Sequence, residues 1–398
     1  MTTFFIREVR MQSGEHIPLL VSGSPLGLPV PLATRYVLTQ FRPKGLKVSS
    51  IRQRLSALAL AYTFFAKHGI QLDERAAKRQ FLSQEELVAL SDYCRRTQKN
   101  GTQRVVGPGY AALRFRVATD YIRWVSEPII SRIVDDSRRD AALGALQSFL
   151  KRAHTVAPAP GRPDASVVSG ERLGFTPEQR ALFLRVIEPG CCDNPFRPQL
   201  QFRNYVMFQL EFELGPRGGE LLGLKTRDVD FSVEPASLTI HRRHDDPEDP
   251  RTSAPATKTL GRLLLLDAKL RDLLDEWITH HRANRQQFPA AAKHPYLFVN
   301  YRGEPLGSRG FRLIVETLRR HHPVLAGLCH HLLRHDWNDR WVELSEEEGS
   351  DPEISLRDQR YAMGWSPTST MPFRYARRAI RNAANKKLLR MQQKGWKK

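Results

Sequence analysis

The stretch Tyr361–Arg378, YAMGWSPTSTMPFRYARR, places one tyrosine among arginines shortly after a Gly-Trp pair. Gly364 before Trp365, with a Ser-Pro pair behind it, predicts a turn, and the residues that follow predict a short helix that carries Tyr375. By itself the stretch has a plain interpretation, an aromatic side chain half-packed on a basic helix. Its significance therefore depends on the residues that precede it in the chain.

An arginine beside a carboxylate lies at a sharp turn well upstream. Residues 203–212 predict a buried helix, and the sequence LGPRGGELLGLKTRDVD, residues 214–230, then breaks it at a Gly-Pro pair. Glu220 follows Arg217 by three residues and can orient the guanidinium. Without further motifs, this pair would be interpreted as a simple ion pair at a turn.

Two strands and a lysine come next. Residues 237–244 and 260–266 predict strands, joined through an acidic, proline-rich segment and the polar sequence Thr-Lys-Thr, and residues 296–300 predict a further strand. The lysine of that sequence, Lys258, would lie at the tip of the hairpin. Because Lys225 and Lys269 flank the same region, the sequence leaves open which of these three lysines lies at the functional position.

The motif CHHLLRH predicts a helix on which His331 and Arg334 lie three residues apart and face the same way. His331 and His335 have the spacing of an HExxH zinc helix, but Leu332 occupies the position of the glutamate, which excludes that class of metalloprotease. Two histidines and two aspartates in residues 241–246 have metal-ligand spacing, for which a solvated acidic loop is the favoured interpretation. We expect neither a metal nor a cofactor.

Taken in order, these four motifs resemble those of the tyrosine recombinase, or phage integrase, family. LGPRGGELLGLKTRDVD resembles its first arginine box, TKT its hairpin lysine, HHLLRH its His-x-x-Arg box, and MGWSPTSTMPFRY its tryptophan position and nucleophilic tyrosine. The resemblance covers residues 173–398, and the helices before them resemble the family's core-binding domain. It implies six catalytic residues and two supporting residues: Arg217, Lys258, His331, Arg334, Trp365 and Tyr375, with Glu220 and His335 in support.

The last motif departs from the family pattern in its spacing. Residues 342–355 lengthen the interval before Trp365, and Trp365 precedes Tyr375 by ten positions, about one more than the family's spacing. Pro372 can be accommodated only if it lies in the first turn of the helix that bears the tyrosine. Tyr361, on the other side of the Gly-Trp turn, is the rival nucleophile.

These residue types suit a metal-independent attack on a DNA phosphodiester, because the pentacoordinate state carries extra negative charge. Arg217 and Arg334 would bind phosphate oxygens, while His331 and the indole of the tryptophan would donate hydrogen bonds. Lys258 would protonate the leaving 5′ oxygen as Tyr375 forms a 3′-phosphotyrosyl link. The covalent link keeps the bond energy, so a second DNA end can reverse the step.

The charge balance favours a nucleic acid partner. The chain has 62 Lys and Arg against 42 Asp and Glu, a formal charge of +20 and a pI near 10.1, which predicts binding to double-stranded DNA. A mean hydropathy of −0.45 and the absence of a long apolar run argue against a membrane protein. With no secretion signal and no CxxC spacing among four cysteines, we expect a cytoplasmic, nucleoid-associated protein with reduced thiols.

A length of 398 residues predicts more than one domain. Residues 1–45 are expected to form an arm or lead-in, and four amphipathic helices in residues 46–152 predict an α-helical core DNA-binding domain. Residues 153–172 predict a linker, residues 173–378 the catalytic domain, and residues 379–398 a basic terminal helix. Ser83 with Glu86, and Thr176 with Gln179, predict capping boxes at the start of a helix in each of the two domains. The expected fold class is mainly α with a small antiparallel β-sheet.

The favoured function is that of a site-specific recombinase or integrase, a DNA strand-transferase that serves a mobile element by integration or transposition. The expected assembly is a tetramer on paired sites, in which the terminal helix packs on a neighbouring protomer, and accessory recombination proteins are further expected partners. Two alternatives stay open: a type IB topoisomerase-like relaxing enzyme, and a DNA-binding protein on the same fold that does not cut. Assembly on paired sites distinguishes a recombinase from the topoisomerase-like enzyme. Covalent trapping distinguishes it from the DNA-binding protein that does not cut.

Overall fold

The computed structural model divides into two compact units, which are described separately below. The units are Met1–Met11 with His16–Gly170, and Gln12–Glu15 with Glu171–Lys398. The structure describes residues 3–23, 27–97, 104–159, 174–243, 245–252, 254–255, 257, 259–375 and 377–395. Among these residues, no helix is both long enough and apolar enough to cross a membrane.

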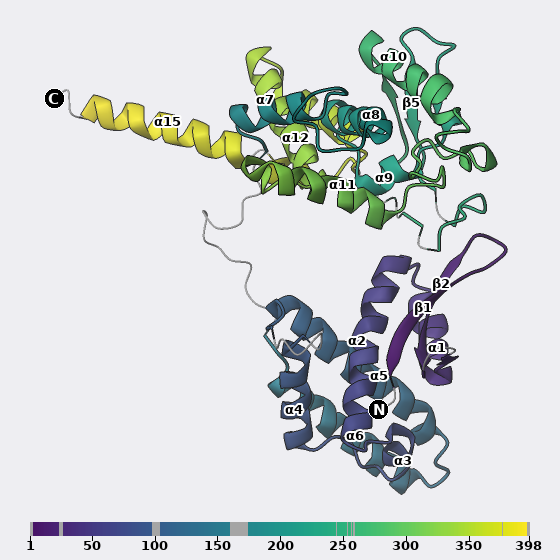
Figure 1. The fold of residues 1–398 in the computed structure, drawn as a ribbon. Helices are drawn as coiled ribbons and strands as arrows, with labels where there is room; N and C mark the ends of the chain where they lie inside the picture. The colour runs from purple at the N-terminus through teal and green to yellow at the C-terminus, as the bar shows by residue number, and fades with distance from the viewer. Residues whose placement is uncertain are drawn as a thin grey trace. The chain divides into compact units, whose positions relative to one another are not determined.

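The first unit is a helical bundle with a small sheet (Figure 1). Its described residues include the four predicted helices, α2 (Val48–Lys67), α4 (Gln84–Arg95), α5 (Pro108–Ser131) and α6 (Asp136–Val156), and a short helix between the first two of them, α3 (Leu72–Ala77). The predicted capping box at α4 is confirmed, because the Glu86 N–H donates to Ser83 Oγ at 3.2 Å and the Ser83 N–H donates to the Glu86 carboxylate at 2.9 Å. Helix α6 runs to Val156, past the expected domain boundary at residue 152.

The amino-terminal segment is not a separate arm, which corrects the expectation for residues 1–45. It forms the antiparallel strands β1 (Phe4–Arg10), β2 (His16–Ser22) and β3 (Leu28–Pro29), followed by α1 (Pro31–Tyr36) and the π-helical turn η1 (Val37–Phe41). Leu20 and Tyr36 share a buried core with Leu55 of α2 and Tyr121 of α5. Burial of these apolar side chains holds the segment on the bundle.

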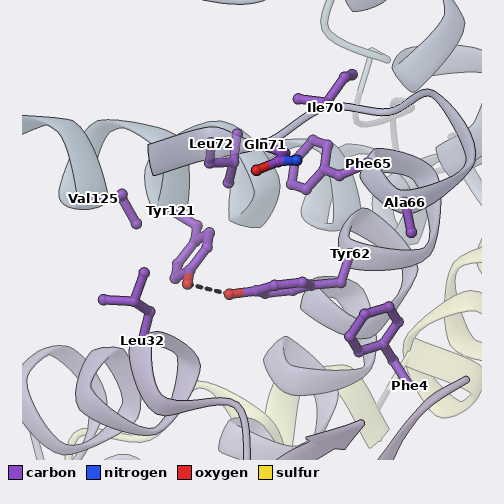
Figure 2. Close-up of a pocket in the computed structure, with 10 residues that line it drawn as sticks. All are labelled: Phe4, Leu32, Tyr62, Phe65, Ala66, Ile70, Gln71, Leu72, Tyr121 and Val125. Carbon is purple, nitrogen blue, oxygen red and sulfur yellow. Dashed lines mark hydrogen bonds between the residues drawn. The ribbon is translucent and has the colours of Figure 1, made fainter. Parts of the chain in front are cut away.

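A cavity of about 240 Å³ lies in this first unit (Figure 2). Its lining is mostly apolar and includes Phe4, Phe65 and Val125. The hydroxyls of Tyr62 and Tyr121 meet at its wall, where their oxygens are 2.5 Å apart in a hydrogen bond. None of the candidate catalytic side chains that the structure describes lines this cavity.

The second unit packs helices around a buried helix, α8, and a small antiparallel sheet (Figure 1). The sheet has the order β4-β5-β6, with β4 (Val229–Asp230), β5 (Ser237–Ile240) and β6 (Arg262–Leu265). The helices are α7 (Pro177–Val186), α8 (Pro198–Leu214), α9 (Gly218–Gly223), α10 (Ala268–Glu276), α11 (Ser308–His321), α12 (His330–Glu347), α13 (Pro352–Ala362), α14 (Met371–Tyr375) and α15 (Arg377–Gly395). The fold class expected from the sequence, mainly α with a small antiparallel sheet, is confirmed.

Local signals placed several of these elements correctly. The Thr176 side chain accepts a hydrogen bond from the Gln179 N–H at 3.2 Å, and the Gln179 side chain accepts one from the Thr176 N–H at 3.1 Å. This confirms the predicted capping box at α7. The lengthened segment 342–355 is also accounted for, since it continues α12 to Glu347 and supplies Asp351 as the N-cap of α13.

Two strand predictions were wrong in extent. Residues 296–300 form only isolated bridges, Lys225 with Tyr296 and Val299 with Pro305, instead of a strand. Strand β5 ends at Ile240 and β6 begins at Arg262, so both strands are shorter than predicted and the connection between them is longer. The Leu260 N–H donates to the carbonyl of Gly364, so it is not available to extend the ladder with β5.

Candidate active site

The turn that carries Arg217 follows the end of α8. Gly215 closes α8 with a φ of +58°, a conformation that favours glycine, and a Cβ there would lie 2.9 Å from both Met363 Cε and Trp337 Cγ. Arg217 is the N-cap of α9, and its backbone N–H donates to Glu220 Oε2 at 3.0 Å. Its guanidinium Nη1 lies 3.8 Å from Glu220 Oε1. Glu220 thus lies beside Arg217 and bonds to its backbone N–H, and its part in orienting the guanidinium stays a prediction.

Glu220 makes its closest guanidinium contact with a residue that sequence analysis missed. Its side chain is fully buried and accepts a hydrogen bond from Arg262 Nη2 of β6 at 2.9 Å. It also accepts one from the Thr259 hydroxyl, which lies in the connection before β6. The signal for Arg262 was present in the sequence, since it is the one charged residue in the apolar run 260–266.

Arg334 joins two turns that are far apart in the chain. Its side chain is buried, and Nη1 donates to the carbonyl of Gly215 at 2.6 Å while Nη2 donates to the carbonyl of Met363 at 2.9 Å. Its guanidinium carbon lies 5.5 Å from the ring centre of Trp365. The arginine turn, helix α12 and the Gly-Trp turn are thus brought together by this one side chain.

Trp365 itself is buried against Trp337 and Met363 in a small separate cluster. The same ring makes the cation–aromatic contact with Arg334. The turn also bonds to the connection before β6, because the Leu260 N–H donates to the carbonyl of Gly364 at 2.9 Å. Trp365 therefore has a packing role, and its proposed part in catalysis stays a prediction.

The adjacent histidines of α12 have different surroundings. His331 is exposed, and its ring lies edge-on to that of His335, with centroids 4.7 Å apart. His330 is turned inward, where Nδ1 lies 2.9 Å from the Glu211 carboxylate and Nε2 bonds to the carbonyl of Phe311 at 2.9 Å. Burial raises the pKa of Glu211, and the contact with His330 opposes this shift. Of this pair, only His331 is placed to meet an external ligand.

The described residues define the backbone around the candidate nucleophile but not its side chain. Tyr375 is the last residue of α14, in which Pro372 occupies the second position, so the proline lies in the first turn as predicted. The Tyr375 side chain, and Lys258 entirely, lie outside what the structure describes. The rival Tyr361 belongs to α13, where its hydroxyl donates to the carbonyl of Leu263 at 3.2 Å.

One of the three candidate lysines is excluded as a general acid. Lys225 is 1% exposed, and its Nζ lies 2.5 Å from Asp246 Oδ2 and 2.6 Å from Glu248 Oε2. The hydrogen bond from Lys225 lowers the pKa of Glu248, so that this partner stays ionised at neutral pH. An ammonium that is already paired with two carboxylates is not available to give its proton to a DNA oxygen. Lys269 lies exposed at the start of α10, and Lys258 stays the predicted acid.

The acidic segment in residues 241–246 is not simply a solvated loop. Asp246 bonds to Lys225 and accepts a hydrogen bond from the Tyr296 hydroxyl at 3.0 Å, so this carboxylate is already satisfied. Among the described residues, the one grouping of three metal-ligand side chains within 4.8 Å is Cys191, Cys192 and Asp193. Asp193 there faces Arg185 at 3.3 Å. All four cysteines of the chain are free thiols.

The second unit contains the elements on which the family resemblance was based: the arginine turn, the His-x-x-Arg helix and the Gly-Trp turn. Residues 191–380 match the phage integrase family. The chain therefore carries a phage integrase domain, which confirms the resemblance found in its motifs.

Individual relatives are more distant. A segment of 139 residues is 27% identical to tyrosine recombinase XerC of Halalkalibacterium halodurans, and covers 35% of this chain and 41% of that relative. The match thus spans less than half the length of the curated relative. Among solved structures, the Tn1549 transposon integrase in complex with transposon right end DNA is similar at 16% identity, with a TM-score of 0.41 and coverage of 77% and 99% of the two chains. XerH site-specific recombinase bound to palindromic difH substrate is similar at 16% identity, with a TM-score of 0.40 and coverage of 76% of this chain and 96% of that chain.

Proposed function

We propose that this protein is a site-specific tyrosine recombinase, or integrase, that cuts and rejoins double-stranded DNA. The observation that carries the proposal is the position of Arg334. Its contacts with the carbonyls of Gly215 and Met363 bring the arginine turn and the Gly-Trp turn to the same end of α12. The phage integrase domain over residues 191–380 and the net charge of +20 support the same function.

The reaction we propose needs no metal. The Tyr375 phenolic oxygen attacks the phosphorus, the P–O5′ bond breaks, and a 3′-phosphotyrosyl bond forms while the phenolic proton passes to water. Arg217 and Arg334 offset the extra negative charge on the pentacoordinate phosphorus. Lys258 gives a proton to the leaving 5′ oxygen and so becomes a neutral amine. Attack by a second 5′ hydroxyl reverses these transfers and joins new strands.

Covalent trapping tests this function. On a nicked suicide site, recovered from DNA that the protein binds in cells, the wild-type chain should form an SDS-resistant protein–DNA adduct. Tyr375→Phe should form none, because it removes the attacking oxygen. Tyr361→Phe is the matched control and should form the adduct normally, since that hydroxyl bonds to a backbone carbonyl of β6. Adduct formation by Tyr375→Phe would refute the assignment.

The same experiment separates the two alternatives. A non-cutting DNA-binding protein would bind the site in a gel shift and yield no adduct with the wild-type chain. A type IB topoisomerase-like enzyme would yield the adduct and relax a supercoiled plasmid that lacks paired sites. A recombinase should form a complex that holds two sites together. We further propose that accessory recombination proteins assist this complex and that the protein acts in the cytoplasm on nucleoid DNA.

The terminal helix is proposed to join protomers in a tetramer on paired sites. Leu388, Leu389 and Met391 of α15 are each more than half exposed, at 52%, 56% and 64%. Apolar side chains exposed together on one helix favour burial against another surface. We propose that the surface belongs to a neighbouring protomer, which would bury them when the chain assembles on DNA.

Deletion of residues 379–398 should therefore leave binding to a single site nearly unchanged and abolish the complex of two sites. The measurement is a native gel with two DNA lengths. A double variant, Lys387→Ala with Arg390→Ala, removes charge from the same exposed helix and keeps its apolar side chains, so it should retain the paired complex. A deleted chain that still pairs sites would refute this role.

A further inference from the structure

His330, the first residue of α12, makes inward contacts that the proposed chemistry does not use. Its side chain is 15% exposed, and its ring stacks on that of Phe311 in α11, with centroids 3.3 Å apart and planes at 9°. Nδ1 lies 3.0 Å and 2.9 Å from the two carboxylate oxygens of Glu211 in α8, and Nε2 lies 2.9 Å from the carbonyl of Phe311. Three helices therefore meet at this one imidazole.

Both ring nitrogens of His330 have partners that fix their protons. A backbone carbonyl can only accept a hydrogen bond, so Nε2 carries a proton and donates it to Phe311. On the other side, one proton between Nδ1 and the carboxylate of Glu211 satisfies both groups. The Glu211 side chain is only 1% exposed, and a buried carboxyl group without a partner is unfavourable. The arrangement of the three groups is therefore well defined.

The contacts of His330 continue to the turn that carries Arg217. A Cβ built on Gly218 would lie 2.6 Å from Phe311 Cε1, so the Phe311 ring lies directly against the residue that follows Arg217. The same phenylalanine ring stacks on His330. A described contact thus leads at every step from the imidazole to the backbone of the arginine turn.

Two parallel contacts join α8 to α12. Glu211 and the C-cap Gly215 are four residues apart at the end of α8, and His330 and Arg334 are four residues apart at the start of α12. His330 contacts Glu211, while Arg334 donates to the carbonyl of Gly215 at 2.6 Å. Because residues four apart lie on the same face of a helix, the two contacts together fix the register of these helices. The contact of His330 fixes the first turn of α12.

We propose that His330 is a positioning residue for DNA cleavage, which sets the place of the Arg217 turn relative to Arg334. This inference rests on the proposed function. His330 acts through other residues, because both of its nitrogens are engaged inside the protein. A displacement of about 1 Å can cost on the order of 10²-fold in rate. Loss of the His330 contacts should therefore weaken the stabilisation that the two arginines give to the charged phosphate.

The test compares two DNA substrates that differ in charge at the scissile phosphate. In a methylphosphonate, a methyl group replaces one nonbridging oxygen and removes its negative charge, so that the arginines have less charge to offset. His330→Phe keeps a stacked ring and removes both hydrogen bonds. On ordinary DNA it should form the Tyr375 adduct about 10–100-fold more slowly than wild type. On the methylphosphonate it should lie within about threefold of wild type. Tryptophan fluorescence checks that equal amounts of folded protein are compared.

Glu211→Gln is the conservative variant. Its amide N–H can donate to Nδ1 while Nε2 still donates to the Phe311 carbonyl, so a neutral His330 keeps both hydrogen bonds. This variant should stay within about threefold of wild type on both substrates. A slow Glu211→Gln would contradict the hydrogen-bonding arrangement on which the positioning role depends.

His322→Phe is the matched control. His322 is the C-cap of α11, and its Nε2 lies 3.0 Å from the carbonyl of Asp193, which belongs to the loop before α8. This histidine also bonds to a backbone carbonyl, but it contacts no residue of the candidate site in the hydrogen bonds described here. Its replacement should change neither rate beyond a factor of about two.

The dependence on the substrate decides the result. A folded His330→Phe chain that is equally slow on both substrates, or normal on both, would overturn the positioning role. If His330→Phe fails to fold, Gly218→Ala tests the same contacts from their other end, because the added methyl group would collide with the Phe311 ring. Gly218→Ala should show the same dependence on the substrate, and its absence would overturn the role equally.

Two reference measurements keep this inference separate from the proposed function. A wild-type chain that forms no Tyr375-dependent adduct would refute the function itself. Arg334→Ala should recover measurable adduct formation on the methylphosphonate, and failure to do so would refute the role of this arginine at the phosphate, and the positioning role with it. If Arg334→Ala recovers and His330→Phe does not, only the positioning role fails.

Discussion

Arg334→Ala is expected to abolish measurable adduct formation and to lower the unfolding free energy of the catalytic unit by about 3–5 kcal/mol. The stability loss follows because the carbonyls of Gly215 and Met363 both lose a charged donor in a buried site, and each such loss costs roughly 1.5–3 kcal/mol. The catalytic loss follows because one preorganised charge donor is typically worth on the order of 10²–10³-fold in rate. Denaturant unfolding and adduct formation at low temperature measure the two effects.

Arg340→Ala separates the two effects. Arg340 lies on the same helix, donates to the backbone carbonyl of Phe212 and stacks on its ring at 3.8 Å. Its removal should therefore destabilise the fold by about 1–3 kcal/mol and leave the adduct rate of the folded protein within about threefold of wild type, since it donates to no group of the candidate site. If Arg334→Ala and Arg340→Ala slowed the reaction equally, the proposed role of Arg334 at the phosphate would be wrong.

Glu220→Ala is expected to cost about 3–5 kcal/mol of unfolding free energy, because it leaves the buried Arg262 guanidinium without its carboxylate. It also removes the acceptor for the Arg217 N–H and the Thr259 hydroxyl. Both the arginine turn and the connection before β6 should therefore loosen. Urea unfolding of the full chain, followed by tryptophan fluorescence, measures the change.

Two comparisons sharpen this expectation. Glu213→Ala removes a carboxylate that is 42% exposed and pairs with Arg340 at the surface, so its cost should stay below about 1 kcal/mol. Glu220→Ala combined with Arg262→Met should be less destabilised than Glu220→Ala alone, because no unpaired buried charge remains. Simple additivity of the two changes would contradict the pairing.

Local signals predicted the beginnings and ends of helices well. The capping boxes at Ser83 and Thr176 involve residues three apart, so their hydrogen bonds can be predicted without knowledge of the rest of the chain. The first-turn position of Pro372 was predictable for the same reason. These elements depend on short-range geometry, which one sequence contains in full.

Strand pairing and the course of the connections were harder to predict. The expected strand at residues 296–300 forms only isolated bridges. Its apolar side chains are buried, but no neighbouring segment that the structure describes pairs with it over more than one residue. The amino-terminal segment was expected to be an arm and instead packs its apolar side chains on α2 and α5. In both cases the outcome depends on surfaces that lie far away in sequence, and periodicity carries no information about them.

The sequence by itself determined the kinds of group that this protein gathers: two arginines, the histidines of the CHHLLRH motif and a tyrosine, in the order typical of a phage integrase domain. Only the tertiary structure decided which of them are buried together. Arg334 became the link between two turns because buried carbonyls need donors. Arg262 became the main partner of Glu220, and Lys225 was removed from the candidate acids, because burial pairs each charge with its nearest counter-charge.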